Sequence, residues 1–197
     1  MVEFKKSVKK VLPYDRRLYI EFFDDDFESS IQWYGISLQL NSEKGKLDFA
    51  AFVEVFDSVF KNIILKLDNG SFWIVNHDDK DLEWFPNDDD NLNLLRNLFK
   101  QNNVPNTYRG ALVLATDDLL ELSKDLISYP YGLFYKKGTL YKNLDISHGE
   151  LQFIIKISGH LTIDLLSTDK MLLRKVISEN TISSFNIKEY RGSSLWL

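Results

Sequence analysis

The chain has 197 residues, of which 44% are hydrophobic and 14% aromatic, with only four Pro and nine Gly. This composition excludes a disordered, collagen-like or Gly/Ser linker protein and predicts a globular fold. The 24 basic and 29 acidic residues give a net charge of -5, and the absence of Cys excludes disulfides, thiolate metal sites and a thiol nucleophile.

The N-terminal region lacks the apolar core of a signal peptide. Its basic residues are followed only by Val11-Leu12 before Pro13, whereas a signal peptide needs about 7 to 15 apolar residues there. The densest apolar stretch, residues 153–166, is interrupted by Lys156 and Asp164 and is shorter than the ~18 residues of a membrane span. We therefore expect a soluble cytoplasmic protein that does not act on membranes.

The first part of the chain predicts two strands and a helix. Residues 18–23 and 31–40 are rich in aromatic and β-branched side chains, which favours strands, and an acidic turn separates them. Residues 48–61 carry large apolar side chains at offsets 0, 3, 4, 7, 10 and 11 from Phe49, which is helical periodicity with a wide apolar face.

A hairpin is expected around Asn69-Gly70, the preferred pair for a type I′ turn. With these two residues as the loop, Leu67 pairs with Phe72 and Leu65 with Ile74 on one face. On the other face Lys66 lies beside Trp73, in the position of a cation–π neighbour.

The middle of the chain predicts helices at residues 92–101 and 117–126, around a strand at 110–115. Asp90 or Asn91 is the expected N-cap of the first of these helices. The sequence Tyr129-Pro130-Tyr131-Gly132 predicts a turn.

A second hairpin is expected over residues 151–166. A three-residue loop at 158–160 pairs Ile157 with Leu161, Ile155 with Ile163 and Lys156 with Thr162, which places apolar side chains on one face. A helix capped by Ser167 or Thr168 and ending near residue 179 follows, and residues 181–190 alternate as a final strand.

These elements predict an α+β fold in which a largely antiparallel sheet built from hairpins has about four helices packed on it. We expect a single domain over residues 1–197. A division into two subdomains near residues 102–106 is the weaker alternative.

An acidic segment, residues 77–91, is the most informative feature for function. It carries seven carboxylates against Lys80 alone, a local charge of -6 that exceeds the charge of the whole chain. Large aromatics ringed by charge are typical of a protein-binding hot spot, and a field of one sign accelerates encounter with an oppositely charged partner. The predicted partner-binding residues are Asp78, Asp79, Asp81, Glu83, Trp84, Phe85, Asp88, Asp89 and Asp90. In the alternative, Trp84 and Phe85 fold back into the core and the aspartates merely solvate a loop.

Metal and cofactor motifs are not found. Frames starting at Asp24 or Asn87 lack the Gly and Glu that an EF-hand loop requires, and the three histidines have no zinc-binding spacing. His148 and His160 are expected at the surface, and neighbouring carboxylates would favour the charged form of His77. We therefore expect no bound metal and no cofactor, with His77 as a minor candidate for a ligand or an acid/base group.

Enzyme motifs are equally weak. Asp68 with Asp78-Asp79-Lys80 can be read as the carboxylates and lysine of a metal-dependent nuclease, but so acidic a loop would repel DNA. Neither a nucleophile elbow nor a phosphate-binding Gly-rich loop occurs. The basic residues at 5–10 belong to a chain with a pI near 5.3, which argues against direct nucleic-acid binding.

The preferred hypothesis is a non-enzymatic acidic module that masks the basic surface of a partner protein, as bacterial immunity proteins and antitoxins do when they inhibit a nuclease toxin. One alternative is a metal-assisted hydrolase or nuclease that uses the acidic segment. The other is a structural or assembly subunit that docks through residues 192–197, which include Trp196.

Overall fold

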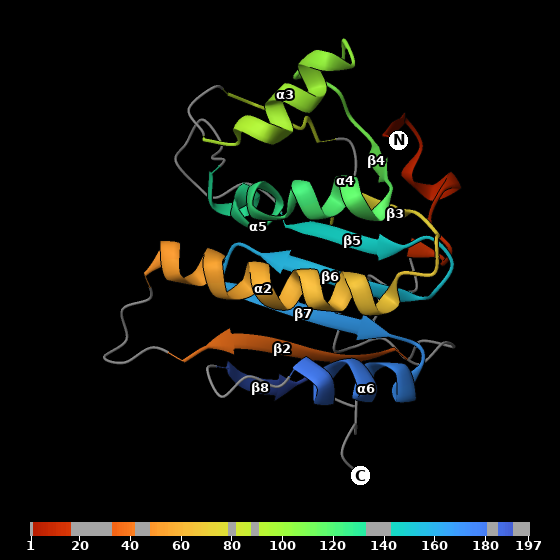
Figure 1. Cartoon of the computed structure of the whole chain (residues 1–197). Helices are drawn as coiled ribbons and strands as arrows, with labels where there is room; N and C mark the ends of the chain where they lie inside the picture. Colours follow the sequence, from red (N-terminus) through yellow and green to blue (C-terminus); the bar gives the residue numbers. More distant parts are fainter. Residues whose placement is uncertain are drawn as a thin grey trace.

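The computed structural model describes residues 2–16, 33–41, 48–78, 82–87, 91–132, 143–180 and 185–190. These residues form an eight-stranded antiparallel sheet with helices packed against it (Figure 1), which confirms the α+β prediction. The strand order is β1-β4-β3-β5-β6-β7-β2-β8. Strands that precede and follow residues 102–106 are therefore neighbours within one sheet.

The strands are short and the sheet is built from them out of sequence order. Their bounds are β1 (Glu3–Lys5), β2 (Tyr34–Leu40), β3 (Trp73–His77), β4 (Ala111–Leu114), β5 (Leu144–His148), β6 (Phe153–Ser158), β7 (Thr162–Ser167) and β8 (Phe185–Glu189). The helices are α2 (Phe49–Leu67), α3 (Asn93–Gln101), α4 (Thr116–Glu121), α5 (Ser123–Gly132) and α6 (Lys170–Asn180), with a 3-10 turn η1 at Val8–Lys10.

Helix α2 begins as predicted but ends at Leu67 rather than near residue 61. The Asp48 side chain caps it by accepting a hydrogen bond from the Ala50 N–H. Phe60, Ile63, Ile64 and Leu67 are all buried, because their spacing continues the helical stripe against the sheet. The residues assigned to the first strand of the Asn69-Gly70 hairpin are therefore helical.

The hairpin prediction at Asn69-Gly70 is thus wrong in its first half. Gly70 has the expected positive φ, at +82°, but Asn69 does not, so the predicted type I′ turn is not formed and these residues join α2 to β3. Lys66 does not pair with Trp73; its ammonium group lies 3.1 Å from the Glu179 carboxylate of α6. Strand β3 instead pairs with β4 and β5.

Two helix predictions in the middle of the chain are also corrected. The predicted helix 117–126 divides at Leu122 into α4 and α5, and residues 129–132 are the last turn of α5 rather than a loop. The N-cap position of α3 is Leu92, one residue after the predicted Asn91, and it makes no side-chain capping hydrogen bond, while Asp90 lies outside the described residues. Instead, Asp125 of α5 accepts a hydrogen bond from the Leu95 N–H, so a neighbouring helix satisfies one of its free donors.

The β6–β7 hairpin has the predicted faces but a register shifted by two residues. Ile157 pairs with Ile163 and Lys156 with Asp164, instead of Leu161 and Thr162. The loop comprises residues 159–161, and Leu161 at φ +57° supplies its left-handed position. A shift of two keeps every side chain on its face, so apolar pairing alone could not distinguish the two registers.

The sheet has one apolar face and one mixed face. Helices α2, α5 and α6 lie across the first face (Figure 1) and bury a single large core against it. On the second face, residues near the N-terminus cover two small apolar clusters: Tyr14 packs on Trp33, Ile154 and Leu166, and Val8, Val11 and Leu12 pack on Ile74, Ala111 and Val113.

Several predictions fall on residues outside those described: the strand at 18–23, the ends of the strands predicted at 31–40 and 181–190, and the C-terminal residues 192–197. Among the described helices, none has both the length and the apolar character needed to cross a bilayer.

Candidate functional site

The acidic segment 77–91 is described only in part. Asp78, Glu83, Trp84 and Phe85 have defined positions, whereas Asp79, Asp81, Asp88, Asp89 and Asp90 lie outside the described residues. The chain on both sides of each undescribed run is placed, at Asp78, at residues 82–87 and from Asn91 onward.

Trp84 and Phe85 are core residues, only 0% and 3% exposed. The Trp84 indole N–H donates to the Gly110 carbonyl oxygen at 3.1 Å, and the Trp84 backbone N–H donates to the Tyr108 carbonyl at 3.0 Å. The Tyr129 hydroxyl donates to the Trp84 carbonyl. The expectation that these aromatics face a partner is therefore corrected, and the alternative, that they fold into the core, is what the structure shows.

Arg96 of α3 fixes the residues that follow. Its guanidinium carbon lies 4.2 Å from the centre of the Phe85 ring, a cation–π geometry. The same guanidinium donates to the Asn87 carbonyl oxygen at 2.6 Å. The Phe85 backbone N–H donates to Asn106. Residues 84–87 are thus attached to both α3 and the segment before β4.

His77, the last residue of β3, is buried rather than set among solvent-exposed carboxylates. Its Nε2 lies 2.7 Å from the Tyr129 hydroxyl oxygen. Because Tyr129 uses its single proton toward the Trp84 carbonyl, His77 must donate from Nε2 to that oxygen. His77 therefore helps to position the aromatic pair, in contact with α5.

The second face of the sheet carries a row of polar residues that sequence analysis did not identify. Cross-strand pairing places them side by side on six adjacent strands, β3, β5, β6, β7, β2 and β8. We call this set the polar row: Asn76, Asp145, Lys156, Asp164, Ser37 and Lys188. Its members alternate acidic and basic at the centre, so each inner charge has an opposite neighbour.

Lys156 is the central cation of the polar row. Its Nζ lies 3.1 Å from an Asp78 carboxylate oxygen and 3.9 Å from an Asp145 oxygen. Burial alone would lower the pKa of Lys156, but the charges of Asp145 and Asp78 outweigh burial and raise this pKa above its ordinary value. The lysine therefore stays charged inside the sheet face.

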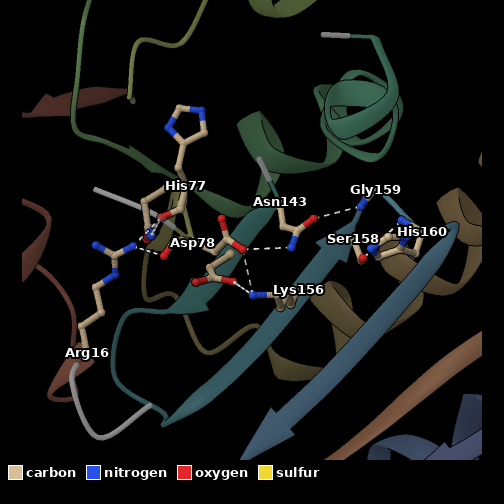
Figure 2. A network of polar contacts seen from close by, with 10 residues as sticks. Arg16, His77, Asp78, Asn143, Lys156, Ser158, Gly159 and His160 are labelled. Carbon is tan, nitrogen blue, oxygen red and sulfur yellow. Dashed lines mark hydrogen bonds and ion pairs between the residues drawn. The ribbon is translucent and has the colours of Figure 1, made fainter. Parts of the chain in front are cut away.

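Asp78 connects the acidic segment to the polar row (Figure 2). Besides contacting Lys156, its carboxylate accepts a hydrogen bond from the Asn143 amide at 2.9 Å. Arg16 donates to the backbone carbonyls of His77 and Asp78. Asn143 in turn accepts from the Gly159 N–H at 2.9 Å. One network thus extends from Arg16 to the β6–β7 turn.

Asp68 and Asp78, the two described carboxylates of the nuclease arrangement considered from the sequence, lie at opposite ends of β3, and Asp79 and Lys80 lie outside the described residues. Asp68 lies before β3, where it accepts hydrogen bonds from Thr116 and the Gly70 N–H, and Asp78 lies after β3. A five-residue strand separates them by roughly 16 Å at about 3.3 Å per residue. In the described part of the chain, no group of three or more His, Asp or Glu side chains has a metal-binding arrangement.

The other two histidines have different surroundings. His160 is exposed in the β6–β7 turn, as predicted. His148 is fully buried at the end of β5, so its predicted surface position is wrong. Its Nε2–H donates to the Leu67 carbonyl at 3.1 Å, and its Nδ1 accepts from the Glu150 and Leu151 N–H groups at 3.1 and 3.0 Å. This histidine joins the end of α2 to the β5–β6 turn.

A polar pocket of about 630 Å³ opens beside the outer end of the polar row. Asp164, Ser37 and Lys188 contribute side chains from the row, and His160, Thr162 and Tyr190 are among the other lining residues. Asp164 is 4% exposed. Burial raises the pKa of its carboxyl above the ordinary value, against the opposing effects of hydrogen bonds from Tyr190 and Ser37 and of the Lys156 charge.

A weak signal for the polar row existed in the sequence. Lys156 and Asp164 each interrupt an otherwise apolar strand, and both lie on the face opposite the helices. The correct register of β6 with β7, and the placement of β2 and β5 beside them, were needed to bring these residues together.

No family model matches the chain, and no curated protein or solved structure shows significant similarity to it.

Proposed function

We propose that the chain is a non-enzymatic protein-binding module that uses the acidic segment to mask a basic surface on a partner, as an inhibitor or immunity protein masks the active surface of a nuclease toxin. The observation that carries this proposal is the anchoring of the segment. Buried Trp84 and Phe85 lie between its two runs of aspartates, and Asp78 and Asn91 flank them.

Anchoring matters because ordering a loop on binding costs free energy, roughly 0.5–1.5 kcal/mol for each immobilised side chain. Trp84 and Phe85 are held by the contacts with Gly110, Tyr108 and Arg96 described above. Each run of three undescribed residues therefore starts and ends at a placed residue. The residues on both sides of each run are therefore fixed before a partner binds.

The charges of the segment divide into two groups. Asp78 is paired with Lys156, and Glu83 lies 2.8 Å from the Arg109 guanidinium, so these two carboxylates serve the fold. We assign partner recognition to the five remaining aspartates: Asp79, Asp81, Asp88, Asp89 and Asp90. A field of one sign at this site would steer a basic surface toward it.

The test is an affinity pull-down from the lysate of the native host. The wild type is compared with a variant in which the five aspartates are changed to Asn. The proposal predicts that the wild type retains a basic protein with nuclease activity, that the variant loses it, and that wild type added to the isolated nuclease inhibits cleavage.

A matched control removes the same number of carboxylates elsewhere. Glu3, Glu54, Asp117, Glu121 and Glu179 are all exposed, and their replacement by Gln or Asn changes the net charge equally. This control should retain the partner as the wild type does. Equal retention by the wild type and the five-aspartate variant would refute the role of the acidic segment.

A further inference from the structure

The pocket beside the polar row contains a carboxylate that the fold does not satisfy. Asp164 is 4% exposed, and its Oδ1 oxygen has no hydrogen-bond partner in the described part of the protein. Buried polar atoms are nearly always hydrogen-bonded, and an unsatisfied one costs about 1–3 kcal/mol. The Asp164 side chain lines the pocket, but this oxygen is itself covered, so a ligand in the pocket reaches it only when the carboxylate rotates.

The ion pairs nearby do not include Asp164. Lys156 is held by Asp78 at 3.1 Å and by Asp145 at 3.9 Å, and within the described residues no cation lies within 4.0 Å of the Asp164 carboxylate. The charges of Lys156 and His160 act on it from longer distances. The carboxylate therefore lacks a direct counter-ion, which a bound cation would supply.

The other lining groups are suited to a cation with several donors. Ser37, Thr162 and Tyr190 contribute hydroxyl oxygens, and Gln39 contributes an amide oxygen. A guanidinium presents five N–H donors in a plane and needs acceptors around it, whereas an ammonium is a compact point charge with three. Several acceptors around one buried carboxylate therefore favour a guanidinium.

Two positive side chains at the pocket weigh against a cation, but they lie at its rim. His160 and Lys188 are exposed, so water and salt screen their charges over about 8–10 Å. Asp164 is buried, where electrostatic interactions are screened much less. The attraction at the floor of the pocket should therefore outweigh the repulsion at its rim.

We propose that this pocket binds a guanidinium group, with Asp164 as its counter-ion and with Ser37, Thr162 and Tyr190 as further acceptors. This site lies apart from the five aspartates of the acidic segment, and the proposal does not depend on their function. The guanidinium can belong to an arginine side chain of a polypeptide or to a small molecule, and the experiment separates these sources.

The experiment is an NMR titration of the full chain, which follows the backbone amides of Ser37, Thr162 and Asp164. Blocked arginine is the probe, and blocked citrulline is its matched control, because citrulline replaces the guanidinium by a neutral urea of nearly the same shape. We expect saturable shifts with arginine and at least about ten-fold weaker binding of citrulline, since hydrogen bonds between charged groups are roughly twice as strong as neutral ones.

Two further ligands separate the sources of the guanidinium. Tighter binding of a Gly-Arg-Gly peptide than of agmatine indicates a polypeptide ligand, and the reverse order indicates a small molecule. Either order supports the guanidinium site. Blocked lysine should bind more weakly than blocked arginine.

Variants test the role of the carboxylate. Asp164→Asn should weaken binding of blocked arginine about ten-fold or more, whereas Glu121→Gln, at an exposed position on α4, should not change it. Lys188→Ala should strengthen binding, and this variant decides the question if Asp164→Asn does not fold. Absence of saturable shifts, equal binding of citrulline, or unchanged binding in Asp164→Asn would overturn the proposal.

Discussion

The ammonium group of Lys156 lies 3.1 Å from the Asp78 carboxylate, although strand β5 separates the strand of the lysine from the strand that precedes the aspartate. The contact therefore spans two strand spacings. It connects the middle of the sheet to the first carboxylate of the acidic segment, and Asp145 of β5 lies beside it.

Replacement of this lysine should strongly destabilise the fold. Lys156→Met leaves Asp78 and the buried Asp145 without their shared cation, and loss of one partner of a buried ion pair costs about 3–5 kcal/mol. Urea denaturation measures the free energy of unfolding. Lys124→Met is the matched control, because the Lys124–Glu54 pair is exposed on both sides and should contribute little. Equal stability of the two variants would show that the Lys156 pairs are not structural.

His148 should remain neutral well below the pH at which a free histidine becomes charged. Burial lowers its pKa from the ordinary value of 6.5. The hydrogen bonds of His148 also disfavour its protonation. Nδ1 accepts from two backbone N–H groups, and a proton on Nδ1 would turn this acceptor into a donor. The pKa of His148 is lower in the folded state than in the unfolded state. The contribution of neutral His148 to stability is therefore complete above pH 6.5 and is lost as the pH falls through the folded pKa.

Nitrogen-15 NMR of the histidine rings tests this prediction directly. The spectrum should show the tautomer with the proton on Nε2, and the His148 signal should titrate below pH 6.5. A proton on Nδ1, or a His148 midpoint at or above 6.5, would contradict the hydrogen-bond assignment.

Asp164 should make stability depend on pH in the opposite direction to an ordinary ion-paired aspartate. Burial raises its folded pKa above 3.8, so between the unfolded and folded pKa values the folded state binds the proton more tightly, and stability falls as pH rises through this window. Asp164→Asn removes this effect. The stability of the variant relative to wild type should therefore increase between pH 4 and pH 7. A constant difference in urea denaturation at the two pH values would refute the raised pKa.

Trp84 should contribute to stability without contacting a partner. Trp84→Leu leaves a cavity and removes the hydrogen bond to Gly110, which should cost about 3 kcal/mol. Leu94→Ala, at a position 44% exposed on α3, is the control and should change stability little. At a temperature where both variants are folded, partner affinity should match that of the wild type. A selective loss of affinity in Trp84→Leu would instead make the indole a contact residue.

Local patterns in the sequence predicted element types better than their connections. Leu67 fits both the strand alternation of the predicted hairpin and the helical stripe of α2, whereas Leu65, which the hairpin would pair with Ile74, is 57% exposed in the helix. The helix prevailed because Phe60, Ile63, Ile64 and Leu67 bury a continuous face in the core. Similarly, the β6–β7 hairpin was predicted with correct faces, while its register depended on Leu161 adopting a left-handed conformation, which a β-hairpin loop prediction would normally assign to Gly or Asn.

The site was less predictable than the fold, for a topological reason. The polar row unites residues from β3, β5, β6, β7, β2 and β8, and β2 joins it only because it pairs between β7 and β8. Local propensity does not specify such non-sequential pairing. The acidic segment was visible as composition, but whether Trp84 and Phe85 face solvent or the core depends on the partners that α3, α5 and β4 provide.

We propose that five aspartates of the acidic segment bind a basic partner. The most direct measurement is the dissociation constant of the isolated partner at low and physiological salt, for wild type, the five-aspartate variant and the five-carboxylate control. We predict that wild type and control bind equally and weaken with salt, and that the five-aspartate variant binds at least about 100-fold more weakly, a loss of some 2.7 kcal/mol, with little salt dependence. Equal affinity and equal salt dependence in all three proteins would contradict the account.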